Sequence, residues 1–102
     1  MSETADTQQF ARKMTDILNY GALNLAMGIG YQTGLFDVMD EMARYAGAEE
    51  IARQAGLDTR YVTEWLSVMV CGGIVELKVG EGEVDRFFLP PAHGDLLTRR
   101  SG

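Results

Sequence analysis

Hydrophobic residues recur at helical spacing through the first third of the chain, which predicts a long first helix. The pattern places a helix from Thr7 to about Asn19 and continues it to about Thr33, with a kink or brief interruption at Tyr20-Gly21. The apolar positions of this helix are Phe10, Met14, Ile17, Leu18, Ala22, Leu25, Ala26 and Ile29. The polar residues 1–6 are expected to be disordered.

Shorter helices separated by glycines are expected next. Gly34 marks the end of the first helix, because glycine readily adopts the left-handed conformation that closes a helix. Short helices are predicted around Phe36–Met42 and at Ala48–Ala55. Asp58 then has the place of an N-cap, whose carboxylate accepts a backbone N–H at the start of a helix ending at Cys71.

The period changes after Gly72-Gly73, where β-branched residues replace the helical stripe. Two strands are predicted at residues 74–79 and 84–89, joined by a turn at residues 80–83. A short helix from Ala92 to Thr98 ends the pattern. A long helix, a short helix, a helix–turn–helix and a hairpin make a winged helix-turn-helix. The expected fold class is therefore mainly α with a small β-hairpin.

Length and composition indicate one globular domain. The chain has 102 residues, of which 46% are hydrophobic. We place the winged-helix domain at residues 7–98 and interpret residues 99–102 as a C-terminal tail or the start of a linker. The single cysteine, Cys71, excludes an internal disulfide and favours a cytoplasmic location. We expect Cys71 to be a small buried hydrophobe, and we expect no metal site.

The stretch GALNLAMGIGYQTGLF, residues 21–36, lacks charge and invites two other interpretations. A membrane span is disfavoured because Asn24 and Gln32 lie inside the stretch and acidic residues, not basic ones, flank it. A nucleotide or methyl-donor loop needs a preceding strand, whereas Gly28–Gly34 follows a helical stripe. We therefore interpret the stretch as a packed helix end and expect neither a membrane partner nor a cofactor in this chain.

The net charge of -6 bears on nucleic-acid binding. Between Gly47 and Pro90, the expected reading helix and wing carry eight acidic and four basic residues, a net charge of -4. Such a surface repels phosphate, so DNA is a disfavoured partner. A winged-helix DNA-binding transcriptional regulator nevertheless remains the main alternative, and a stand-alone protein-interaction module is a further one.

Three segments together resemble a known family. They read GLFDVM, EEIARQAGLDTRYVTEWLSVMVCGGIVE and FFLPPAHGDLLT. In this order they resemble the N-terminal winged-helix domain of bacterial class I S-adenosylmethionine-dependent methyltransferases, over about residues 15–100. One departure is Ala46-Gly47-Ala48, where such domains often place Ser or Thr as a helix cap. The other is that the sequence given stops where the family continues into its catalytic domain. This suggests either a fragment or a stand-alone relative.

The resemblance implies a role without catalysis. This chain would be a non-catalytic dimerisation and substrate-covering module of a small-molecule methyltransferase, and S-adenosylmethionine would be bound by the rest of the parent enzyme. It also implies a homodimer formed through the N-terminal helices. No catalytic residue is assigned, and His93 is interpreted as a surface or capping residue. The residues expected to make dimer or substrate-pocket contacts are Tyr20, Leu25, Gly28, Tyr31 and Trp65.

Overall fold

The longest element of the computed structural model, which describes residues 2–98, is helix α1 (Ser2–Thr33). This helix begins five residues before the expected Thr7. Serine and acidic residues in the segment SETAD favour a helix N-terminus, which accounts for the earlier start. The helix is also continuous through Tyr20-Gly21, so the expected kink is wrong. One interior glycine costs only about 1 kcal/mol, too little to break a long helix. Residues 1 and 99–102 lie outside the described residues, and the expected C-terminal tail or linker lies there. The expected disorder at the N-terminus stays a prediction.

Gly34 ends α1 as expected. Its φ of 81° is left-handed, and the chain turns directly into α2 (Leu35–Met42). Leu35 and Phe36, the first residues after this turn, are completely buried. The glycine therefore lets a long projecting helix join the compact part of the molecule within a single residue.

Two further helices form the helix–turn–helix. Helix α3 (Ala48–Ala55) ends at Gly56, whose φ of 70° is left-handed, and α4 (Thr59–Cys71) follows. The Asp58 carboxylate accepts a hydrogen bond from the Tyr61 N–H at 3.2 Å, which confirms the predicted N-cap. Helix α3 has no side-chain cap, in agreement with the absence of Ser or Thr before it.

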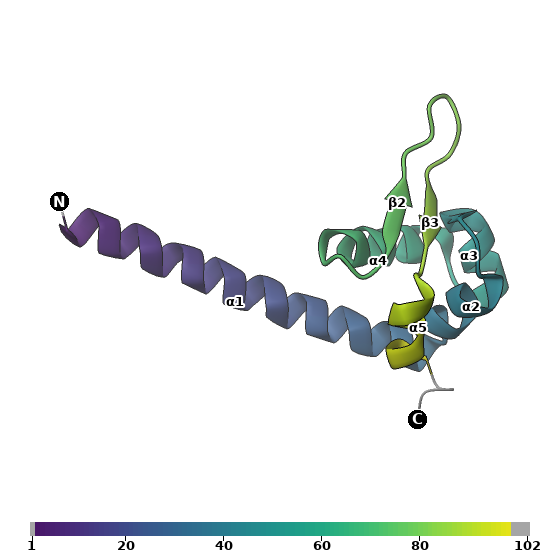
Figure 1. The fold of residues 1–102 in the computed structure, drawn as a ribbon, viewed down its shortest axis with the longest axis horizontal. Helices are drawn as coiled ribbons and strands as arrows, with labels where there is room; N and C mark the ends of the chain where they lie inside the picture. Colours follow the sequence, from purple (N-terminus) through teal and green to yellow (C-terminus); the bar gives the residue numbers. More distant parts are fainter. Residues whose placement is uncertain (1, 99–102) are drawn as a thin grey trace.

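The wing is a three-stranded antiparallel sheet, so the expectation of a two-stranded hairpin is corrected. Strand β1 (Ala46–Gly47) pairs with β3 (Arg86–Phe88), which also pairs with β2 (Glu76–Lys78), in the order β1-β3-β2. Both hairpin strands are shorter than expected. At the loop end, the Asp85 side chain accepts the N–H of Gly80 at 3.0 Å, and before β2 the N–H groups of Ile74 and Val75 donate to the Met69 carbonyl oxygen at the end of α4. The wing projects from the helices in Figure 1.

The core lies between the helices and the base of the wing. At its centre, the rings of Phe36 and Trp65 meet edge to face with centroids 5.1 Å apart. Helix α5 (Pro91–Leu97), expected at residues 92–98, packs against α2 and closes the other end. The buried hydrophobic residues are Leu35, Phe36, Met39, Ala46, Ile51, Ala52, Val62, Trp65, Leu66, Met69, Val75, Phe87 and Leu89. None of them comes from α1.

Candidate interaction surface on the long helix

One side of α1 carries large apolar side chains that no other residue between positions 2 and 98 covers. Leu25 is 73% exposed, Leu18 67% and Phe10 64%. We call this side the outer face. It consists of Phe10, Met14, Ile17, Leu18, Gly21, Leu25 and Gly28, which lie along one stripe of the helix because, apart from the adjacent Ile17 and Leu18, they are three or four residues apart. The first half of α1 extends away from the rest of the molecule in Figure 1, so the outer face is accessible along its length.

The opposite side of α1, its inner face, packs on α4. Trp65 lies under this face and donates a hydrogen bond from Nε1 to the Ala26 carbonyl oxygen at 2.8 Å. The contact is close: a Cβ added to Gly30 would lie 2.5 Å from Trp65 Cζ2, and one added to Gly72 would lie 2.6 Å from Leu23 Cδ1. Positions 23, 26 and 30 lie about half a turn from the outer face. Helix α1 is therefore apolar on two sides, and its own domain covers only one.

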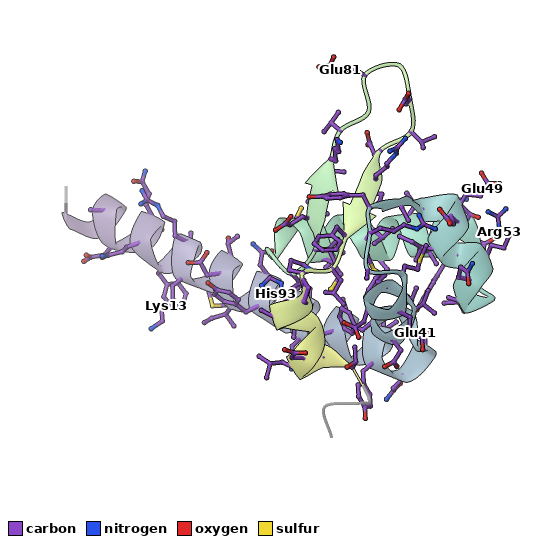
Figure 2. The ribbon with its side chains drawn as sticks, turned by 45° about the vertical axis from the view of Figure 1, so that its right-hand side comes forward. Lys13, Glu41, Glu49, Arg53, Glu81 and His93 are labelled. Carbon is purple, nitrogen blue, oxygen red and sulfur yellow. The ribbon has the colours of Figure 1, made fainter. Side chains whose placement is uncertain are left out.

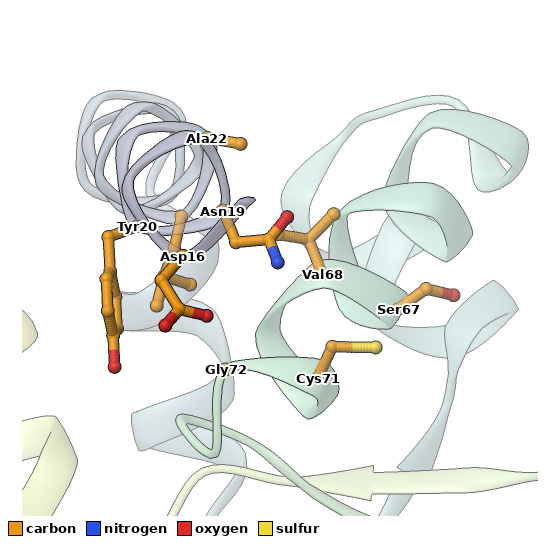
Figure 3. A pocket seen from close by; sticks show the side chains of 9 residues that line it. Asp16, Asn19, Tyr20, Ala22, Ser67, Val68, Cys71 and Gly72 are labelled. Atoms are coloured by element: carbon orange, nitrogen blue, oxygen red, sulfur yellow. The ribbon is translucent and has the colours of Figure 1, made fainter. Parts of the chain in front are cut away.

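A groove of about 500 Å³ opens where α1 and α4 diverge. Figure 3 shows Asp16, Asn19 and Tyr20 of α1 on one side, and Ser67, Val68 and Cys71 of α4 on the other. The wall is mainly apolar and includes one carboxylate. The groove borders the inner face of α1. The groove and the outer face therefore lie on opposite sides of the same helix.

The structure separates the five residues expected to make contacts. Leu25 and Gly28 belong to the outer face, and an added Cβ at Gly28 would meet nothing within 4 Å. Tyr20, 72% exposed, lines the groove, and Tyr31 is 47% exposed near the end of the helix. Trp65 is buried under the inner face, so any contact with a partner would need the core to open. Only Leu25 and Gly28 lie together.

Cys71 is exposed, which corrects the expectation of a buried thiol. It is the last residue of α4, and the buried side of that helix is filled by Leu66 and Met69. His93 is half-buried, and its Nδ1 lies 2.8 Å from the Ile74 carbonyl oxygen. That contact joins α5 to the segment before β2, so the residue connects two elements.

The first half of the outer face is absent from the contact residues that the sequence predicts. Phe10, Met14, Ile17 and Leu18 were assigned to the helical stripe but not to a site. The sequence does indicate a second apolar surface, because the apolar residues at positions 23, 26 and 27 define a second stripe on the other side of the same helix. Two opposed apolar stripes on one helix indicate two covering surfaces.

The glycine-rich segment does not fit a methyl donor. A donor loop presents free backbone N–H groups between a strand and a helix N-terminus. Residues 28–33 instead lie inside α1, where the helix itself uses the backbone N–H groups. No helix between residues 2 and 98 is long and apolar enough to cross a membrane. Over the same residues, no three His, Cys, Asp or Glu side chains gather as a possible metal site.

Three arginines around the wing and α4 are paired with carboxylates. Arg60 lies 3.7 Å from Glu64, Arg86 lies 3.3 Å from Glu83, and Arg44 pairs with Glu50. The hydrogen bond from Arg44 lowers the pKa of the Glu50 carboxyl, with its positive charge acting in the same direction. Figure 2 places Glu81 at the tip of the wing and Glu49 on the outside of α3.

A second contact fixes the wing to the loop before β1. The Tyr45 hydroxyl donates a hydrogen bond to Glu76 Oε2 at 2.9 Å, and its ring stacks on Phe88 with centroids 5.1 Å apart. Donation to that carboxylate raises the pKa of the Tyr45 phenol, helped by partial loss of water. The wing is therefore held on the body by aromatic stacking and a hydrogen bond.

These elements define a winged helix-turn-helix domain, which confirms the expected fold class. The comparison with protein families is more specific: the chain belongs to the Rv2258c-like winged HTH domain family, whose model matches residues 21–99. The expected resemblance to a methyltransferase domain is confirmed at the level of fold. Human N-acetylserotonin methyltransferase, solved in complex with SAM, is similar with a TM-score of 0.77 and 16% sequence identity. The match covers 89% of this chain but 26% of that enzyme. No curated protein matches the sequence.

Proposed function

We propose that this chain is the non-catalytic N-terminal dimerisation and substrate-covering module of an S-adenosylmethionine-dependent small-molecule methyltransferase. The family match, and the similarity in fold to one quarter of a solved methyltransferase, support this class. In the proposal, the methyl donor binds to another part of the parent enzyme, in the cytoplasm. This chain contributes assembly and one wall of the acceptor pocket.

The uncovered outer face of α1 is the observation that carries the dimerisation role. Burying a leucine or phenylalanine side chain is favourable by about 1.5–3 kcal/mol. Leu25, Leu18 and Phe10 are each more than 60% exposed, so most of that gain is available to a partner. The inner face cannot serve the same purpose, because α4 already covers it through Ala26 and Gly30.

The groove between α1 and α4 supports the substrate-covering role. It combines an apolar wall with a carboxylate, a phenol and a hydroxyl, from Asp16, Tyr20 and Ser67. Pockets for small organic molecules typically have this composition. In the proposal, the groove faces the catalytic part of the parent and limits the size of the acceptor.

DNA reading is disfavoured by charge. Arg60 at the start of α4 and Arg86 on the wing each lie beside a carboxylate, so their charges are partly offset before any phosphate approaches. The acidic balance of the hairpin adds a repulsive field. We therefore assign the wing a structural role in the proposed module.

The test of dimerisation compares two exposed leucines by light scattering. Leu25→Glu places a charge on the outer face and is expected to give a monomer. Leu96→Glu is the matched control, because Leu96 is 82% exposed but belongs to α5 and not to the outer face, so the variant should remain dimeric. A dimer in both variants would overturn the assignment of the outer face. A salt-dependent shift of duplex DNA by the wild-type chain would favour the regulator instead.

A further inference from the structure

From Phe10 to Leu25, the outer face of α1 has the same spacing of positions when it is followed in either direction. Counted outward from the midpoint between Ile17 and Leu18, Met14 matches Gly21 and Phe10 matches Leu25. In a pair of identical chains related by a twofold axis, a residue that contacts a position on the partner is itself contacted by the same position. A face that is symmetric about one point can therefore meet a second copy running in the opposite direction.

One of the matching pairs is complementary in size. Met14 is large and matches Gly21, while Phe10 matches Leu25, one turn before Gly28. Added Cβ atoms at Gly21 and Gly28 would meet nothing within 4 Å in the same chain. Each glycine costs about 1 kcal/mol in a helix, and no packing within the chain requires either of them. A partner helix supplies the reason, because each glycine leaves space for a large side chain from that partner.

We propose that the outer face binds a second copy of this chain, with the two α1 helices antiparallel and the twofold axis passing between Ile17 and Leu18. This proposal rests on the proposed function and adds to it the direction and register of the pair. Met14 of each copy packs over the partner's Gly21, and Phe10 packs between the partner's Leu25 and the partner's Gly28. Ile17 and Leu18 meet at the axis.

Charge along α1 favours the antiparallel direction. The five charged residues of the helix all lie between Glu3 and Asp16, and residues 17–33 carry none. In a parallel pair, each charged residue would lie beside the same residue of the partner, and the two helix dipoles would point in the same direction. Both arrangements are repulsive. The antiparallel pair instead places the charged half of each helix beside the uncharged half of its partner. Lys13, which projects from the free half of α1 in Figure 2, then lies level with the partner's Ala22.

The rest of each chain leaves room for this pairing. Ala26 and Gly30 hold the compact part of the molecule against the inner face, on the side away from the partner helix. Before the groove, α1 has no other described element beside it in Figure 1. In the pair, this free half lies along the second half of the partner's α1, and the two compact parts lie at opposite ends.

Disulfide cross-linking tests the register, in a Cys71→Ser background that removes the exposed native thiol. The double variant Met14→Cys/Gly21→Cys should form a covalent dimer on mild oxidation, since position 14 faces the partner's position 21. Within one helix these positions are about 10 Å apart, beyond the reach of a disulfide, so an internal bridge does not form. Met14→Cys alone and Gly21→Cys alone should remain uncrosslinked. In an antiparallel pair, position 14 lies about 10 Å along the helix from the partner's position 14, and the same holds for position 21.

The outcomes separate the register from dimerisation itself. Single variants that cross-link as fast as the double variant would show a parallel pair and overturn the proposal. A dimer by light scattering that forms no bridge in any variant would overturn the register while self-association stands. A wild-type monomer would overturn both the register and the dimerisation role.

A rescue experiment provides a second readout. Both of its substitutions introduce good helix formers, so they do not unfold α1. Gly21→Met should weaken the dimer by about tenfold, because two large side chains then compete for one space. Adding Met14→Ala to Gly21→Met should restore the affinity, since the large and small partners have exchanged positions. Failure of the second change to restore the dimer would contradict the contact between position 14 and the partner's position 21.

Discussion

At Gly30, α1 lies so close to the core that an added Cβ would overlap two buried rings, so Gly30→Ala tests the packing directly. The new Cβ would lie 2.5 Å from Trp65 Cζ2 and 2.7 Å from Phe36 Cε2. Neither ring can easily move, because Trp65 is hydrogen-bonded to the Ala26 carbonyl and both rings are buried. Overpacking of this kind costs about 1–3 kcal/mol, and the gain in helix propensity offsets about 0.5–1 kcal/mol.

The net expectation is a loss of about 1–2 kcal/mol, which lowers Tm by about 5–15 °C for a domain of this size. The change in Tm is measured by thermal unfolding, monitored by circular dichroism and by Trp65 fluorescence. Gly28→Ala is the matched control, since the added Cβ meets nothing within the chain and the substitution should preserve or raise stability. Both variants are compared at low concentration, where a subunit interface contributes least. A Gly30→Ala protein as stable as the wild type would refute the packing of α1 on Trp65.

Other predictions concern the helix cap, the exposed thiol and an ion pair. Asp58→Ala removes the acceptor for the Tyr61 N–H and should cost about 1 kcal/mol in urea denaturation; an unchanged midpoint would contradict the capping role. Cys71 should react with a thiol reagent in the folded protein, and a reaction that needs denaturant would show that it is buried. The pKa of Glu50 is lowered in the folded state, so the stability from its pair with Arg44 is present above the usual carboxyl pKa. That stability is lost as pH falls through the lowered value. The difference in stability between the wild type and Glu50→Gln should therefore shrink in acid, and a difference that grows would contradict the pairing.

Local signals in the sequence predict most of the fold. Gly34, Gly56 and Asp58 each have a conformational or capping property that acts within a few residues, and all three mark helix boundaries as expected. The switch from helical to alternating periodicity after Gly73 locates the wing. Such boundaries depend on short stretches of chain, so a single sequence is enough to place them.

Features that depend on distant residues could not be predicted in the same way. Strand β1 is only Ala46–Gly47, and it exists because it pairs with β3 some forty residues later. To predict the outer face, one must know which of the two apolar stripes of α1 is covered by the domain. The position of Trp65 decides which stripe is covered.

The central claim is that this chain assembles through α1 and holds no methyl donor. Light scattering on the purified chain, with S-adenosylmethionine titrated into the same sample by calorimetry, tests both parts together. We expect a mass of about twice 11.2 kDa and no heat of binding. A monomer that binds S-adenosylmethionine would contradict both the role of the outer face and the interpretation of residues 28–34 as a packed helix end.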